Sequence, residues 1–236
     1  LTMSALGSGA TYRVTQYGSY SAEAGGTEMN EQTPFDKTNL VAWYDFGDAT
    51  DAHGSADMTP SGSPTYNSGY VSTTEVPAVY LSASLNSFTA GGDTTDKTWV
   101  IRFRVTGAFD TDYGYVFNDA FVSYLRATVA DGIRCNVAGV TLLSGVPMAA
   151  NTWYTVIAES NATTDVARLW INNTLTNTQT TTTPYGISIP IEFGAQETNA
   201  GAGTDFAFFA CFNRLLTAEE RTRLYNGGAD INYSEL

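Results

Sequence analysis

Apolar and polar residues alternate in short segments along most of the chain. Between residues 99 and 105, Trp99, Ile101, Phe103 and Val105 alternate with more polar positions. This two-residue period is that of a β-strand with one buried face. Similar β-like segments occur at residues 40–46, 76–81, 115–129, 132–143, 153–159, 166–171, 187–193 and 206–212. The pattern therefore predicts an all-β fold.

Turn signals separate these segments. Asn172 and Asn173 follow the segment 166–171 directly, and a threonine-rich stretch begins after them. Asn tolerates a positive φ, which the tightest hairpin turns require. We expect a hairpin there, and we expect a loop over residues 48–69, which are rich in Gly, Asp and Ser.

One short helix is predicted near the C-terminus. Thr217 is a good N-cap, and Glu220 three residues later completes a capping box. Arg221 and Arg223 lie toward the C-terminal half, where cations complement the helix dipole, and Gly227 is expected to end the helix. We expect this helix to pack against the β-structure and hold it together, without a role in an active site.

The last β-segment is apolar on both faces. Strict alternation places Phe206, Phe208, Ala210 and Phe212 on one side and Ala207, Phe209 and Cys211 on the other. A strand with one solvent-exposed face would alternate between apolar and polar residues. Something must therefore cover the second face: the N-terminal region, a long loop or another subunit. Phe206, Phe208 and Phe212 are accordingly the candidate residues of a subunit interface.

Three regions differ in composition. Residues 1–38 are rich in Gly, Ser, Thr and Glu and are predicted to form an extended arm or edge strands. Residues 39–230 hold the β-segments and the helix, and residues 231–236 form a tail. A single core of this size is ordinary for a chain of 236 residues.

The chain is acidic. It has 11 basic and 24 acidic residues, for a formal charge of −13. Such a field repels phosphate backbones and anionic lipid surfaces, so nucleic acid and membrane surfaces are disfavoured as partners. No apolar run is long enough to cross a bilayer.

Cys135 and Cys211 are the only cysteines, and His53 is the only histidine. Both cysteines alternate with apolar neighbours and are predicted to face the core, either as free thiols or as a disulfide. Two cysteines and one histidine that are isolated from one another do not make a metal site.

Several phrases of the sequence occur together in one known superfamily. Residues 40–46 read LVAWYDF, 169–173 read LWINN, 212–220 read FNRLLTAEE and 224–228 read LYNGG. In this order they resemble the laminin-G-like, concanavalin A-like lectin and glucanase superfamily, of the kind found in phage structural proteins and secreted bacterial proteins. The resemblance implies a two-sheet antiparallel β-sandwich, or jelly roll, with one short C-terminal helix.

Most catalytic patterns of that superfamily are missing. Its glycanases resemble one another in a Glu-x-Asp-x-x-Glu strand, and its alginate lyases in a Gln-x-His element. Neither occurs here, and the acidic strand often found before the closing phrase is replaced by residues 206–212. We therefore predict that the chain is not an enzyme, with a glycoside hydrolase or polysaccharide lyase of unrecognised site as an alternative.

Four residues are candidates for carbohydrate binding. If Leu169 and Ile171 face the core, Trp170 and Arg168 face outward, and Arg102 and Arg104 likewise point away from their apolar neighbours. Trp could stack on a sugar face, and Arg pairs well with carboxylate or sulfate, so an acidic glycan would fit. The alternative is that Trp170 is covered and that the arginines are solvated or paired with acids.

A structural calcium ion is a further candidate, because many members of the superfamily hold one in a loop. Asp48 and Asp51 lie where such a loop would be, and Ca²⁺ requires six to eight oxygen ligands. An Asx turn explains the same residues equally well.

The favoured interpretation is a non-catalytic surface recognition module that binds a polysaccharide on a cell surface. It would be displayed on a virion surface or in the extracellular space. The rival interpretation is a phage head or tail decoration protein, whose main role is contact with other virion or surface subunits, including a homo-oligomer.

Overall fold

The structure is a computed structural model, and it describes residues 34–73, 79–85, 95–106, 114–118, 124–128, 132–137, 139–181, 191–194 and 203–236. Nearly all of the predicted N-terminal arm, residues 1–38, lies outside this part of the chain. Residues 35–236 form one compact unit, which includes the C-terminal tail. No helix in the described ranges is long and apolar enough to span a membrane.

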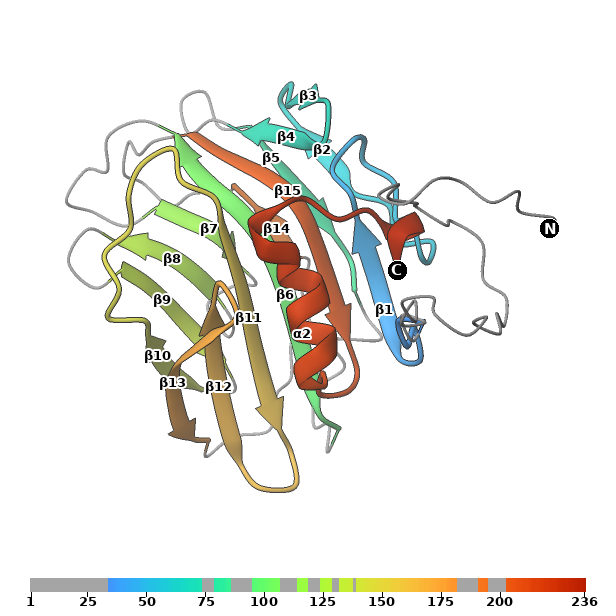
Figure 1. The fold of residues 1–236 in the computed structure, drawn as a ribbon. Coiled ribbons are helices and arrows are strands. Elements are labelled where there is room, and N and C mark those ends of the chain that lie inside the picture. Colours follow the sequence, from blue (N-terminus) through green and yellow to red (C-terminus); the bar gives the residue numbers. More distant parts are fainter. Residues whose placement is uncertain are drawn as a thin grey trace, which may run out of the picture. The chain divides into compact units, whose positions relative to one another are not determined.

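The described strands form two antiparallel sheets (Figure 1). The first sheet has the order β13-β12-β11-β6-β15-β4-β3, with β1 paired to β15. Its strands are β1 (Leu40–Tyr44), β3 (Thr65–Asn67), β4 (Tyr70–Thr73), β6 (Lys97–Thr106), β11 (Tyr154–Asn161), β12 (Val166–Ile171), β13 (Thr174–Thr180) and β15 (Gly203–Phe212). The predicted all-β fold with antiparallel sheets is confirmed.

The second sheet has the order β10-β9-β8-β7-β14-β5-β2. Its strands are β2 (Thr59–Ser61), β5 (Tyr80–Ala83), β7 (Gly114–Asn118), β8 (Tyr124–Thr128), β9 (Gly132–Val137), β10 (Val140–Leu143) and β14 (Ile191–Phe193). Strands β2 and β3 occupy part of the region 48–69 that was expected to be a loop. They were not predicted because three residues are too few to show a period.

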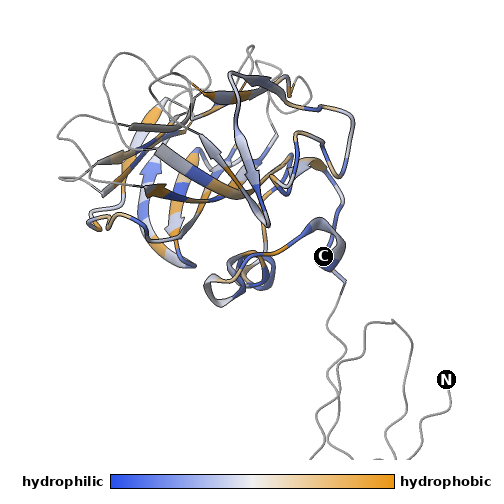
Figure 2. Ribbon diagram, turned by 90° about the horizontal axis from the view of Figure 1, so that it is seen from above, coloured by the Kyte–Doolittle hydropathy of each residue, from blue (hydrophilic) through white to orange (hydrophobic). Residues whose placement is uncertain are grey.

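The main core lies between the sheets. It contains Tyr44, Trp99, Phe103, Phe193 and Phe209, all almost fully buried. Figure 2 shows the alternation behind this core as orange and blue bands along the strands. Cys135 and Cys211 are buried here and are not joined in a disulfide, which decides between the two alternatives left open above.

A second core lies on the outward face of the first sheet. Helix α2 (Ala218–Tyr225) lies across this face, in front of β6 and β15 in Figure 1, and the 3₁₀ helices η1 (Asn226–Gly228) and η2 (Tyr233–Glu235) follow it. Leu216, Leu224, Ile231 and Leu236 pack onto the sheet with Phe35. Strand β6, predicted to be half-buried, is therefore buried on both faces over most of its length.

The capping box predicted for α2 is present. The Thr217 side chain accepts from the backbone N–H of Glu220, and the Glu220 side chain accepts from the backbone N–H of Thr217. The helix ends at Asn226, which adopts the left-handed conformation with φ 47°, one residue before the expected Gly227. The predicted hairpin is present too, with φ of 50° at Asn172 and 62° at Asn173.

The tail is held by one aromatic residue of η2. The Tyr233 hydroxyl lies 3.0 Å from Nδ1 of His53, and the Lys37 Nζ lies 3.8 Å from the centroid of the same ring. Its backbone N–H donates to Asp45 Oδ1 at 3.1 Å. These contacts join the C-terminal tail to β1 and to the loop after it.

Candidate functional site

The closing strand β15 faces its own chain on both sides. The register shifts between Phe206 and Phe208, so Phe206 and Phe209 enter the core between the sheets, whereas Phe208 and Phe212 enter the second core. Strict alternation had placed Phe206 and Phe208 on one side, which is wrong because of this irregularity. Phe206, Phe208 and Phe212 are all 0% exposed. The α2 segment supplies the required cover, and these side chains present no surface to a second subunit.

Trp170 and Arg168 lie on the outward face of β12, as expected, but Trp170 is only 7% exposed. The guanidinium carbon of Arg221, from α2, lies 4.5 Å from the centroid of the indole. Arg168 is half-buried and lies opposite Glu159 of β11 in register. Because α2 covers its ring, Trp170 is a packing residue in this structure, and it offers no open platform to a sugar.

Arg102 is buried on the outward face of β6. Its Nε lies 2.7 Å from Asp230 Oδ1, its Nη1 donates to Thr155 Oγ1 at 3.3 Å, and its Nη2 donates to the Gly228 carbonyl. The side chain is 4% exposed, whereas Asp230 is 50% exposed. These contacts connect β6 to the segment that follows α2, so Arg102 is mainly a structural residue.

Arg104 lies two residues further along β6 and is more open, with 27% of its side chain exposed. Its Nε lies 2.7 Å from Asp205 Oδ2 of β15. Its guanidinium carbon lies 5.2 Å from the ring centroid of Tyr70 and 4.8 Å from that of Trp153. The two rings meet edge to face, with centroids 5.9 Å apart. A cation thus lies beside a pair of half-buried aromatic rings and is near both of them.

A row of polar groups extends from Arg104 across the sheet. Arg104, Asp205, Ser72 and Thr65 are successive partners in register on four adjacent strands. The Ser72 hydroxyl donates to Asp205 Oδ1 at 2.7 Å, and Asn67 Nδ2 donates to the Ser72 hydroxyl at 3.1 Å. The row ends at the exposed β3 edge, beyond the cover of α2.

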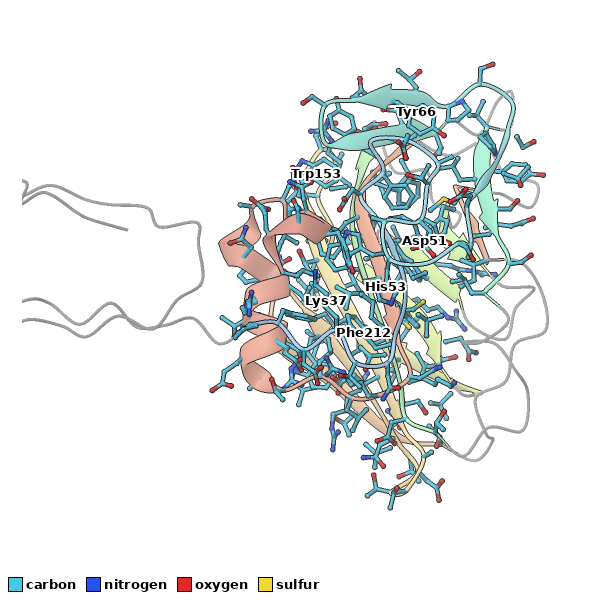
Figure 3. The ribbon with its side chains drawn as sticks, turned by 90° about the vertical axis from the view of Figure 1, so that its right-hand side faces the viewer. Lys37, Asp51, His53, Tyr66, Trp153 and Phe212 are labelled. Atoms are coloured by element: carbon cyan, nitrogen blue, oxygen red, sulfur yellow. The ribbon has the colours of Figure 1, made fainter. Side chains whose placement is uncertain are left out.

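We call this group the arginine–aromatic cluster. It consists of Tyr70, Arg102, Arg104, Trp153, Asp205 and Asp230. Figure 3 places Trp153 at the same end of the sandwich as the strand that carries Tyr66. Aromatic faces, hydrogen-bond donors and acceptors lie together here in fixed positions, which is the arrangement that a sugar-binding surface needs.

The sequence interpretation identified Arg102 and Arg104 of this cluster but missed Trp153, whose ring lies near both guanidinium groups. Tyr154 pairs with Phe103, so the preceding Trp153 lies beside Arg104 on the same outward face. The signal was present: Tyr154 and Val156 face the core, and alternation then turns Trp153 outward. Tyr70 could not be found in this way, because its strand β4 has only four residues.

The candidate calcium ligands are engaged within their own loop. Asp51 accepts hydrogen bonds from the backbone N–H groups of Trp43, His53 and Ala56, at 3.0, 3.0 and 3.2 Å. Asp48 accepts hydrogen bonds from the hydroxyl and from the backbone N–H of Thr50. These two bonds, the hydroxyl bond first, hold the pKa of Asp48 below its ordinary value. Within the described residues, no three His, Cys, Asp or Glu side chains gather as a metal site. Calcium binding here stays a prediction, and the observed geometry is that of Asx turns.

The comparisons with known proteins find structural similarity without sequence similarity. No protein-family model and no curated protein matches the chain. Among solved structures, it resembles the ligand-binding domain of botulinum neurotoxin serotype D in complex with N-acetylneuraminic acid (TM-score 0.68, 14% identity). That match covers 81% of this chain and 51% of the other.

Two further solved structures are similar to the same degree. One is the binding domain of Paraclostridial Mosquitocidal Protein 1 (TM-score 0.68, 13% identity, 81% of this chain and 53% of the other). The other is the receptor-binding domain of botulinum neurotoxin C/D mosaic serotype (TM-score 0.66, 13% identity, 81% and 52%). This chain spans about half the length of each of these domains. At such identities the similarity concerns the fold, which is a β-sandwich shared with receptor-binding domains.

Proposed function

We propose that the chain is a non-catalytic recognition module that binds a polysaccharide through the arginine–aromatic cluster. The observation that carries the proposal is the pair of half-buried rings, Tyr70 and Trp153, that contact each other beside Arg104. The sandwich shared with receptor-binding domains supports a binding role. The module would belong to the laminin-G-like superfamily. It would be displayed on a virion surface or on the exterior of a cell.

The charges of the cluster favour a neutral glycan over an acidic one. Arg102 and Arg104 each lie 2.7 Å from a carboxylate, that of Asp230 or Asp205. Two cations are thus balanced by two anions in a chain of formal charge −13. A carboxylated or sulfated sugar would have to compete with these aspartates, whereas hydroxyl groups can add to the remaining donors and acceptors. This reverses the preference for acidic glycans that the arginines alone suggested.

A glycan array followed by calorimetry tests the proposal. The array carries neutral, carboxylated and sulfated oligosaccharides, and the best one is titrated into the full chain. Removing one stacking ring costs about 1.5 kcal/mol, so Trp153→Ala should weaken binding about tenfold. The matched control is Tyr66→Ala, which removes an exposed ring, 37% exposed, from the adjacent strand β3.

The outcomes separate clearly. Binding of a neutral oligosaccharide that Trp153→Ala weakens and Tyr66→Ala does not would support the proposal. Binding only of acidic sugars, weakened by salt, would contradict the neutral class but keep a glycan function. No binding on the array, or equal effects of both variants, would reject the cluster as a sugar site.

The rival role is that of a structural protein whose contacts with other subunits are its purpose, such as a phage decoration protein. One specific feature favours a subunit contact: a side of the sandwich that carries no charge. That feature is independent of the cluster.

A further inference from the structure

The last strands of the two sheets lie together on one side of the sandwich. Strand β13 ends the order of the first sheet, and β10 ends that of the second. Asn177 of β13 donates from Nδ2 to the carbonyl of Leu143 on β10 at 2.8 Å. Figure 1 shows the two strands next to each other at the lower left, with β9 above β10 and β12 beside β13. We call β10, β13 and Val146, three residues after the end of β10, the neutral edge.

The neutral edge carries no ionisable group, in a chain with a formal charge of −13. Residues 135–158 and 169–191 contain no Asp, Glu, Lys, Arg or His, and they include all of β10 and β13. The formal charge of −13 therefore lies elsewhere on the molecule. Two end strands from different sheets thus share an uncharged surface here, and this side also carries exposed aliphatic residues.

The same edge exposes apolar side chains. Leu143 is 39% exposed, Val146 44% and Leu175 50%. They are three of the four large hydrophobic residues that are exposed in the described part of the chain, the fourth being Tyr66. Single exposed apolar residues are normal on proteins, whereas several on one uncharged edge indicate a contact surface.

Strand β13 carries no charged residue or proline to protect its edge, and its pairing with β12 contains one register irregularity between Leu169 and Trp170. Natural edges carry lysine, proline or inward charges, which prevent pairing with another chain. Residues 174–180 read TLTNTQT, without any of these, and four of the seven are threonine, which favours extended backbone. Most of these side chains are exposed. In the described structure, the outer side of β13 has no strand paired with it.

We propose that the neutral edge is a dimer contact, at which β13 pairs with β13 of a second copy of this chain. Two copies that each carry a charge of −13 repel each other over most of their surfaces. At the neutral edge they approach without facing like charges. A two-fold axis brings the same strand of both copies together in antiparallel order, which extends the first sheet across the pair and brings Leu175 into the contact. A basic partner would instead be drawn to the acidic surfaces.

The mass of the full chain in solution tests this contact, measured by sedimentation equilibrium over a range of concentrations. The unmodified chain should reach twice the 25.3 kDa of one copy. Thr178→Lys places a charge on exposed β13 and should weaken the dimer at least tenfold. The matched control is Thr65→Lys on exposed β3, at the opposite end of the same sheet, which should leave the dimer unchanged.

Salt provides a second readout. Screening reduces the repulsion between the two acidic copies, and the neutral edge has no ion pairs to lose, so the dimer should become tighter as ionic strength rises. Circular dichroism and thermal unfolding establish that each variant is folded. Leu175→Ser, which removes an exposed apolar side chain without adding charge, gives an independent test if Thr178→Lys is unfolded.

Three results would overturn the proposal. The first is a monomer at every concentration and salt. The second is a dimer that folded Thr178→Lys and Leu175→Ser leave intact, or that Thr65→Lys disrupts equally. The third is a dimer that dissociates as salt is added, because that behaviour belongs to a contact made by charges.

Discussion

The guanidinium carbon of Arg221 lies 4.5 Å from the centroid of the Trp170 indole. The same guanidinium donates from Nη1 to the carbonyl of Leu216 at 2.6 Å and to the Glu159 carboxylate at 3.2 Å. Arg221 therefore joins α2 to the outward face of two strands. The described part of the chain is therefore arranged in three layers, helix, sheet and sheet, and the end strands β3 and β13 of the first sheet remain exposed.

Trp170 should act on stability and not on glycan binding. Truncation of a buried Trp costs about 3–5 kcal/mol of unfolding free energy, and Trp170 is packed between Ile157 and α2. We expect Trp170→Ala to lose that amount in urea unfolding while the affinity of the folded protein is kept. Trp153→Ala, at a half-buried site, should show the opposite pattern. A loss of affinity with full stability in Trp170→Ala would contradict this assignment.

Arg104 and Asp205 should be energetically coupled. Asp205 is buried, and its carboxylate accepts from Arg104 Nε and from the Ser72 hydroxyl. Arg104→Ala removes the countercharge of a buried carboxylate, and a charged hydrogen bond is worth about 1.5–3 kcal/mol. We expect the double variant Arg104→Ala/Asp205→Ala to cost less than the sum of the single ones in denaturant unfolding. Additive costs would mean that the pair does not interact in solution.

Asp51 should stabilise the fold without calcium. Its carboxylate accepts from three backbone N–H groups, among them that of Trp43, which is fully buried. A buried donor left without a partner costs about 1–3 kcal/mol. Asp51→Ala should therefore lower the unfolding free energy by at least that amount in a chelator. If the loss appears only in the presence of Ca²⁺, and the unmodified chain gains stability from the ion, the loop is a calcium site.

Acid should weaken the attachment of α2 through Glu220. Burial acts to raise the pKa of Glu220, but its hydrogen bonds with Arg214 and Thr217 and the charge of Arg214 outweigh that effect and leave the pKa below 4.5. A carboxyl with a lowered folded-state pKa stabilises the fold above its unfolded value, and this contribution disappears as the pH falls through the lowered folded-state value. Glu220→Gln should therefore flatten the decline of unfolding free energy below pH 4.5.

Glu159 provides the contrast in the same pH series. Burial raises the pKa of Glu159 above 4.5, although Arg221 acts in the opposite direction. A raised folded-state pKa means that the contribution of Glu159 is present below pH 4.5 and is lost as the pH rises through the raised value. Glu159→Gln should thus change the slope of unfolding free energy against pH above pH 4.5, and should leave the slope below pH 4.5 unchanged. Identical profiles for the two variants would contradict both assignments.

The local structure followed from the sequence because its causes are local. A two-residue period identified β6, short β-like segments identified β11, β12 and β15, and the capping box at Thr217 and Glu220 identified α2. The same alternation correctly turned Trp170, Arg102 and Arg104 away from the core between the sheets. The sequence pattern did not predict very short strands such as β2 and β3, since three residues do not display a period.

What covers an outward face was decided only by the tertiary structure. Alternation shows which residues share a face, but the packing of α2 over Trp170 and the register shift at Phe206 depend on residues far away in the chain. The pairing of Arg104 with Asp205, and the meeting of β10 and β13, likewise join positions that no sequence period relates. The sequence alone thus determined the longer strands, the helix and the orientation of side chains wherever the alternation is unbroken. Long-range packing determined which of those side chains are left for a ligand or a second subunit.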